Sequence, residues 1–185
     1  MFDLIKSKLR NILLEGKDKN KTYDYGCVMF YFDIDKKDWD AYQDLIDEDD
    51  VTTADGLGRE TEPHVTLLYG LHKTIKDEEV ESIIDDFKGP EIRFNHLSIF
   101  ENDNFDVVKF TIRNESLNKM NKKLKVLDHT NDFPKYEPHV TLAYVKKGEG
   151  SKYNQTLKGD LDKKLIPTKI VYSRADGTKK EYKIN

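Results

Sequence analysis

The chain has very little cysteine, since Cys27 is the one cysteine among 185 residues. This excludes an intramolecular disulfide and a cysteine zinc cluster. Long apolar runs are also lacking, because none approaches the roughly 18 residues of a membrane-spanning helix. No signal-peptide core precedes a small-residue cleavage site. We therefore expect a soluble, cytoplasmic protein without a membrane span.

An excess of positive charge is lacking too. The formal net charge of -4 excludes a strongly basic protein that coats nucleic acid. A small anionic ligand stays compatible with this charge, because a cleft can be locally positive on an acidic protein. The 10 Tyr and 9 Phe residues, in a chain that is 37% hydrophobic, argue against disorder and provide for a packed core.

Hydrophobic patterning divides the chain into an N-terminal segment and one domain. Residues 1–21 predict an amphipathic helix over 2–15, which Gly16 ends, and then a polar linker. Residues 22–185 predict a domain of alternating elements. The expected strands span 25–34, 63–69, 92–100, 105–112, 139–145, 166–173 and 179–184, and the expected helices 35–47, 77–87 and 116–127.

An eight-residue stretch occurs twice. Residues 62–69 read EPHVTLLY and residues 137–144 read EPHVTLAY, so the copies differ at one position. Each copy follows a predicted strand and helix and precedes a strand, a turn and a strand. This internal duplication predicts an α+β fold of two lobes, about 22–104 and 105–185, related by a pseudo-twofold axis. Each lobe is expected to be a small antiparallel sheet with helices outside, and the lobes to flank a central cleft.

The repeated stretch carries a pair of polar side chains suited to acid–base chemistry. On a strand, His64 and Thr66 share one face, and so do His139 and Thr141. A pseudo-twofold axis would bring these faces together across one groove. One imidazole could then deprotonate an attacking hydroxyl or water while the other protonates the leaving oxygen. Each Thr hydroxyl could donate to phosphate oxygens.

Two other interpretations of the motifs are weaker. A single His-x-Thr in a strand is more often structural than catalytic, but a duplication that preserved only packing need not preserve a polar pair. A zinc site formed by both histidines with Glu62 and Glu137 is disfavoured, because no His-x-x-x-His or His-Glu helix spacing occurs. We therefore expect neither a metal nor another cofactor.

Residues around the motifs allow two interpretations each. Glu62 and Glu137, two positions before each histidine, could orient the imidazoles or lie exposed in a turn. Tyr25 and Tyr31 are expected on the face of the first strand that lines the groove, where they could stack on a nucleotide. They could equally be ordinary aromatic residues of a sheet.

The Gly- and Lys-rich loop at 146–155 follows the second motif directly. Its glycines could let it close as a lid, and its lysines could attract a phosphate. Lys152 and Tyr153 are the candidate substrate-binding residues of this loop. A solvated run of charges is the simpler interpretation.

The paired motifs resemble those of the 2H phosphoesterase superfamily, which includes bacterial 2′-5′ RNA ligase-like proteins, cyclic phosphodiesterases and phage anti-CBASS nucleases. The resemblance covers roughly residues 25–184. The flanks of the second motif, 132–136 and 144–148, are similar to phage-encoded members. This resemblance implies a two-lobed α+β fold, a metal-free cleft and cleavage at ribose-linked phosphates. It assigns catalytic roles to His64, Thr66, His139 and Thr141.

The leading hypothesis is a metal-independent phosphodiesterase that degrades a cyclic oligonucleotide immune signal, acting in the host cytoplasm if phage-encoded. The expected partner is a small cyclic nucleotide or oligonucleotide, without a stable nucleic-acid complex, since a long polyanion usually needs a basic track. Alternatives are a 2′,3′-cyclic or 2′-5′ phosphodiesterase that processes RNA ends, and a nucleotide-sequestering binding module. A partner protein that acts through the N-terminal helix is a further alternative.

Overall fold

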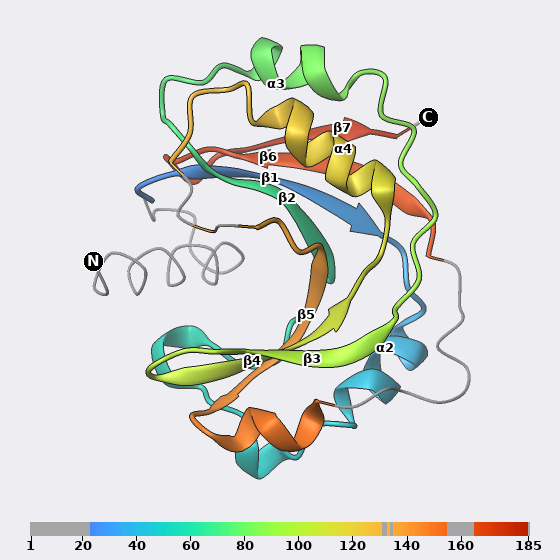
Figure 1. Ribbon diagram of the computed structural model, residues 1–185, viewed down its shortest axis with the longest axis vertical. Coiled ribbons are helices and arrows are strands. Elements are labelled where there is room, and N and C mark those ends of the chain that lie inside the picture. Colours follow the sequence, from blue (N-terminus) through green and yellow to red (C-terminus); the bar gives the residue numbers. More distant parts are fainter. Residues whose placement is uncertain (1–22, 131–132, 134, 155–164, 185) are drawn as a thin grey trace.

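A single antiparallel sheet, bent into an arch, organises the part of the chain that the computed structural model describes, residues 23–130, 133, 135–154 and 165–184 (Figure 1). The expected N-terminal helix and linker lie outside these residues. The strands are β1 (Gly26–Phe32), β2 (His64–Leu71), β3 (His96–Glu101), β4 (Phe105–Thr111), β5 (His139–Lys146), β6 (Pro167–Ser173) and β7 (Lys179–Lys183).

The helices lie on the convex side of the arch (Figure 1). In the described residues they are α2 (Lys36–Gln43), α3 (Asp77–Ile84) and α4 (Glu115–Leu124), with 3₁₀ turns η1 (Glu48–Asp50), η2 (Ala54–Gly56) and η3 (Glu149–Tyr153). Side chains that accept from first-turn amides cap two of them, Asp35 at α2 and Asn114 at α4. The predicted α+β class is confirmed, and no described helix is long and apolar enough to span a membrane.

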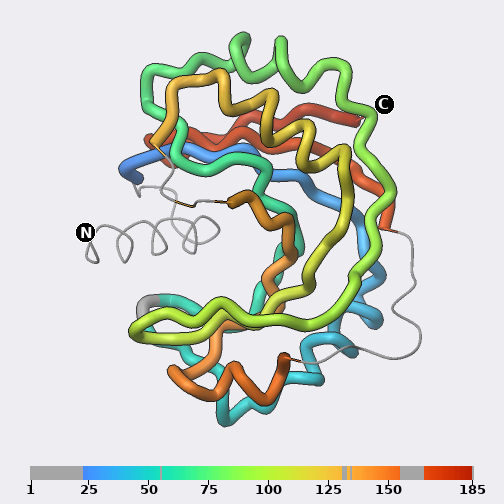
Figure 2. Tube along the Cα trace, viewed as in Figure 1, coloured from blue at the N-terminus to red at the C-terminus, as the bar shows by residue number. Residues whose placement is uncertain are grey.

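The strand order is β3-β4-β5-β2-β1-β6-β7, with the two motif strands side by side at the centre. They pair antiparallel through Val65 opposite Val140, the middle residues of the two motifs. A pseudo-twofold axis through this pair exchanges β2 with β5, β1 with β4, and β6 with β3. Figure 2 shows the β3–β4 and β6–β7 hairpins at the two ends of the arch.

Neither half of the sheet is one continuous stretch of chain, which differs from the expected lobes 22–104 and 105–185. β3 lies beyond β4, in the half that carries the second motif. β6 and β7 lie beyond β1, in the half that carries the first motif. The reason is that β3 pairs with β4 as a hairpin and β4 pairs with β5. The β3–β4 hairpin, which follows the first motif in the chain, therefore pairs with the strand of the second motif.

The main hydrophobic core lies between the sheet and the helices. Its fully buried strand residues include Val28, Phe30, Val65, Leu67, Leu97, Val108, Phe110, Val140 and Leu142. The Val of each motif is 0% exposed. Neighbouring residues on a strand point to opposite faces, so the His and Thr of each motif face the concave side.

Candidate active site

The four motif side chains meet on the concave face of the sheet. Because Val65 lies opposite Val140, the antiparallel register places His64 across from Thr141 and Thr66 across from His139. All four side chains are half-buried. No acceptor for either Thr hydroxyl occurs among the described residues. Two imidazoles and two uncommitted hydroxyls are thus gathered around the pseudo-twofold axis.

Both imidazoles are held in the same orientation by the main chain. Nδ1 of His64 lies 2.8 Å from the carbonyl oxygen of Glu62, and Nδ1 of His139 lies 2.7 Å from that of Glu137. A carbonyl can only accept, so Nδ1 carries the proton and donates it. Nε2 of each histidine is left for acid–base work. The orienting contact comes from the main chain of the two glutamates, whose side chains are exposed.

The surroundings of the two histidines differ. His64 packs against the ring of Tyr31, with 5.3 Å between ring centroids and 31° between planes. His139 meets the ring of Phe100 edge-on, at 4.9 Å and 88°. The pKa of His139 is lowered to about 4, chiefly by burial. The charges of Lys109 and His64 contribute to this lowering, and the carbonyl and the charge of Glu137 oppose it. His139 is therefore neutral at neutral pH.

A bulge in each motif strand brings two further tyrosines to the motif face. On β1, Met29 pairs with Thr66, and Cys27 pairs with Tyr69, so β2 has one residue more than β1 between these pairs. The extra residue reverses the alternation that predicts Tyr69 on the opposite face. The same shift between β4 and β5 brings Tyr144 opposite Val107. Strict alternation would place both tyrosines on the core face, with Val65 and Val140, and the bulges place them on the motif face instead.

Two small apolar clusters flank the motif residues on this face. The first aromatic cluster consists of Tyr25, Tyr31 and Tyr69 with Cys27, Met29 and Val171. The second aromatic cluster consists of Phe100, Phe105 and Tyr144 with Leu57 and Val107. The structure therefore brings both candidate tyrosines, Tyr25 and Tyr31, to the motif face, Tyr31 directly against His64. Sequence reasoning missed the second cluster, although two of its residues, Phe105 and Val107, share one face of the predicted strand 105–112.

Two side-chain amides support the bulges from the core side. Asn121 of α4 donates to the carbonyl oxygen of Leu67 at 2.6 Å, and Gln43 of α2 donates to that of Leu142 at 2.9 Å. Each carbonyl belongs to the residue that follows the motif's Thr. A bulge disturbs the hydrogen-bond ladder, and leaving a buried carbonyl without a donor is costly. The Leu142 carbonyl also accepts from the backbone amide of Glu60 at 2.9 Å. The amides therefore stabilise the backbone that carries each His-x-Thr pair.

Replacing Asn121 with Ala should lower the free energy of unfolding by about 1–3 kcal/mol, because the buried Leu67 carbonyl loses its donor. Denaturant unfolding of variant and wild type measures the difference. Asn118 is exposed on the same helix, so Asn118→Ala is the matched control and should stay within about 0.5 kcal/mol. Equal stability of Asn121→Ala and the wild type would show that the amide does not support the bulge.

Lys152 and Tyr153 are not brought to the motifs. Tyr153 is 5% exposed and belongs to the main core on the convex side. Its hydroxyl donates to Asp50 and accepts from the amide of Asp47. Lys152 Nζ lies 2.6 Å from the same Asp50 carboxylate. The expected lid is corrected, because residues 149–153 form η3 and are held by a buried network.

The turn that leads into η3 is fixed in a similar way, together with the start of η3. The buried carboxylate of Asp106 accepts from the amides of Gly148 and Gly150, at 2.9 and 3.1 Å. A Cβ on Gly150 would lie 2.7 Å from that of Asp106, so this close approach requires glycine. These glycines serve packing and turn geometry, and they do not act as the hinges of a lid.

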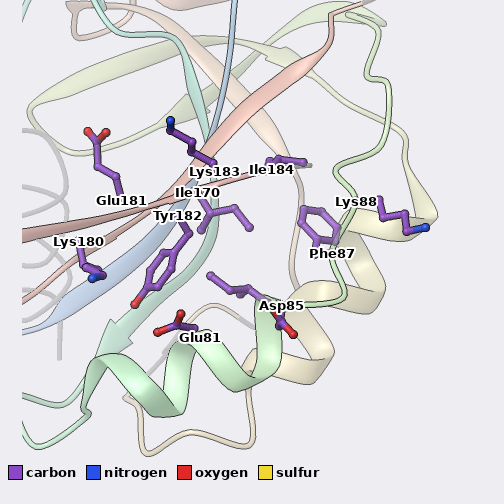
Figure 3. A pocket seen from close by; sticks show the side chains of 11 residues that line it. Glu81, Asp85, Phe87, Lys88, Ile170, Lys180, Glu181, Tyr182, Lys183 and Ile184 are labelled. Carbon is purple, nitrogen blue, oxygen red and sulfur yellow. The ribbon is translucent and has the colours of Figure 1, made fainter.

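A separate groove lies on the convex side, between α3 and the β6–β7 hairpin (Figure 3). Ile84, Phe87, Ile170 and Tyr182 line it together with charged side chains of both signs. None of the motif residues lines it. Within the described residues, no group of three or more His, Cys, Asp or Glu side chains is arranged to hold a metal ion.

The paired His-x-Thr strands, in a chain whose family match spans both motifs, are those of the 2H phosphoesterase superfamily. The chain belongs to the family described as "Anti-CBASS protein Acb1", which matches residues 59–164. That match contains both motifs.

Solved structures with a similar fold include Usb1 of Kluyveromyces marxianus, with a TM-score of 0.57 at 9% identity, covering 87% of this chain and 98% of that one. The structure of the same protein with uridine monophosphate has a TM-score of 0.55 at 9% identity, and the match covers 86% of this chain and 98% of that one. E. coli LigT complexed with 3′-AMP has a TM-score of 0.46 at 13% identity, and the match covers 88% of this chain and 96% of that one. No curated protein sequence matches the chain.

Proposed function

We propose that this protein is a phosphodiesterase that cleaves a ribose-linked phosphodiester in a cyclic oligonucleotide, using His64 and His139 as acid and base. The observation that carries the proposal is the placement of two tethered imidazoles beside two uncommitted Thr hydroxyls on one concave face. The family's description as an anti-CBASS protein supports the substrate class, since the phage anti-CBASS nucleases degrade cyclic oligonucleotide signals.

The two histidines take different roles in this mechanism. His139, which is neutral at neutral pH, accepts the proton of an attacking hydroxyl or water as the oxygen bonds to phosphorus. The bond from phosphorus to the leaving oxygen then breaks, and His64 donates a proton to that oxygen. Thr66 and Thr141 donate hydrogen bonds to the non-bridging phosphate oxygens, where negative charge builds up. Exchange of protons with water restores both imidazoles.

The two aromatic clusters support a substrate with two bases. They lie on either side of the motif residues, with Tyr31 against His64 and Phe100 against His139. Bases stack on aromatic side chains, at about 1–3 kcal/mol per base. A phosphodiester at the axis with a base on each cluster fits a cyclic dinucleotide. Usb1, with the same fold, has been solved with uridine monophosphate, which supports nucleotide binding to this fold.

The test is a panel of substrates with excess chelator present: cyclic di- and trinucleotides, 2′,3′-cyclic mononucleotides, and RNA that ends in a 2′,3′-cyclic phosphate or contains a 2′-5′ linkage. We expect a cyclic di- or trinucleotide to be linearised with the highest kcat/KM. A preference for RNA ends would replace the proposal with RNA processing. Binding without turnover would indicate a sequestering module, and rates that require added Zn²⁺ or Mn²⁺ would contradict the acid–base mechanism.

The pH dependence should reflect the state of His139. Its ordinary pKa near 6.5 is lowered to about 4 in the fold, so the base form is present above about pH 4. We expect kcat/KM to rise through about pH 4, and to fall on the alkaline side as the general acid loses its proton. Initial rates between pH 3.5 and 9 measure this profile. A rising limb near pH 6.5 would contradict the assignment of His139 as base.

A further inference from the structure

Lys109 is a buried lysine on the motif face that the mechanism above does not use. It is 3% exposed, and it pairs across strands with Thr141. Its Nζ donates to the Ser98 hydroxyl at 2.9 Å and lies 3.9 Å above the centroid of the Phe100 ring. The same ring contacts His139. Burial lowers the pKa of Lys109, and the charge of Glu137 raises it.

Lys109 has no counterpart of the same charge in the other half of the pseudo-symmetric sheet. On β4, Lys109 lies opposite Thr141, and on β1 the equivalent position opposite Thr66 is Met29. Both positions adjoin the bulge of their strand pair. The two halves of the motif face are therefore matched in shape but differ in charge at this position.

The lysine beside the first aromatic cluster is neutralised. Lys169, whose Nζ lies 5.4 Å from the centroid of the Tyr31 ring, is paired with Glu181 at 2.7 Å. Among the described residues, no carboxylate forms a salt bridge with Lys109. A buried ammonium held by a hydroxyl and a ring is costly unless an anion joins it. Such an arrangement is typical of a site that receives an anionic ligand.

We propose that Lys109 is a positioning residue of this site, whose charge attracts the scissile phosphate towards His139 and Thr141 and makes His139, not His64, the base. The proposal rests on the proposed function. A negative phosphate and a positive ammonium attract each other, and burial of the ammonium strengthens the attraction. The same positive charge disfavours protonation of His139. The histidine in the half of the site that carries Lys109 is therefore the one that accepts the proton of the attacking group.

The groups that act on the protonation of His139 come from the surrounding strands. Lys109 on β4 and His64 on β2 oppose its protonation by their positive charge. Glu137, next to the start of β5, favours it. His96 on β3 lies two strands away in the same row. Among these groups Lys109 is the lysine on the strand that pairs directly with the second motif.

The experiment compares Lys109→Met with the wild type, because Met is the residue at the equivalent position of the other half. We expect kcat/KM for the cyclic dinucleotide at pH 7 to fall roughly tenfold or more, with KM raised. The rising limb of the pH profile should move to higher pH, because the loss of a positive charge favours protonation of His139. Lys109→Arg, which keeps the charge, should restore the position of that limb.

A titration of the His139 imidazole by NMR, on the protein without substrate, gives a readout independent of turnover. In Lys109→Met the midpoint should also move to higher pH. Lys119 is exposed on α4, so Lys119→Met is a control for the change in net charge and should leave the titration in place. A folded Lys109→Met protein with an unchanged titration and an unchanged KM would overturn the proposal. If the wild type cleaves no panel substrate, the proposed function fails, and the titration still decides whether Lys109 controls His139.

Discussion

Replacement of His64 or His139 by Ala should each lower kcat/KM for the cyclic dinucleotide by about 10²-fold or more. Each change removes one of two groups that transfer a proton in the same step, and a positioned acid or base contributes about 10²–10⁴-fold. The double variant should be little slower than the slower single variant, because groups that act as a unit are not additive. Steady-state rates for the three variants measure both expectations.

His129 provides a matched control. Its Nδ1 lies 2.7 Å from the main-chain carbonyl two residues earlier, the same contact that holds both motif histidines, but it lies outside the motifs. His129→Ala should therefore keep a rate near that of the wild type. All the variants should remain folded, because the motif side chains are half-exposed and leave the core intact. Turnover near the wild-type rate in either single motif variant would contradict the acid–base mechanism.

The symmetric part of the fold could be predicted because the sequence is itself repeated. Two copies of Glu-Pro-His-Val-Thr-Leu predict two equivalent strands, and alternation along each strand predicts which face carries the histidines. The pairing of Val65 with Val140 places the axis at the centre of the repeat. On the first strand, alternation also predicts Tyr25 and Tyr31 on the motif face, where the structure has them.

The bulges could not be predicted, because they depend on contacts between distant segments. Strict alternation places Tyr69 with Val65, on the core face, whereas one extra residue after Thr66 moves it to the other. Nothing local in Leu67-Leu68 marks that position as a bulge. It becomes favourable once Asn121, far along the chain, donates to the carbonyl of Leu67. In the second copy, Gln43 and the backbone amide of Glu60 both donate to the carbonyl of Leu142.

Lys152 and Tyr153, which were expected on a lid, illustrate a different limit of prediction from sequence. Gly, Lys and Ser in the segment 146–155 are typical of a mobile loop, but composition does not report a buried partner elsewhere. Asp50 and Asp106 are those partners, and both are buried. The sequence also did not indicate that Lys109 is buried beside the motifs, since one lysine in an apolar strand is easily taken for a surface residue. Superposition of β1 on β4 about the axis shows the difference, because Met29 occupies the position equivalent to Lys109.

Replacement of Thr66 or Thr141 by Val should each lower kcat by about 10²-fold, with a smaller effect on KM. Val keeps the shape and the strand preference of Thr, so the change removes a hydroxyl and little else. Neither hydroxyl has an acceptor among the described residues, and both adjoin the imidazoles on the concave face. Loss of one donor to a developing oxyanion costs about 10²–10³-fold in other hydrolases.

The serine variants separate the hydroxyl from the methyl group. Thr66→Ser and Thr141→Ser keep the donor and should stay within roughly tenfold of the wild type, since the transition state still receives its hydrogen bond. If both Val variants keep the wild-type rate, the threonines only pack the strand, and charge stabilisation must come from other groups. If the Ser variants are as slow as the Val variants, the methyl group, and not the hydroxyl, is what the site requires. The proposed role of the hydroxyls therefore requires slow Val variants together with fast Ser variants at both positions, and the pseudo-twofold axis predicts the same pattern in each half.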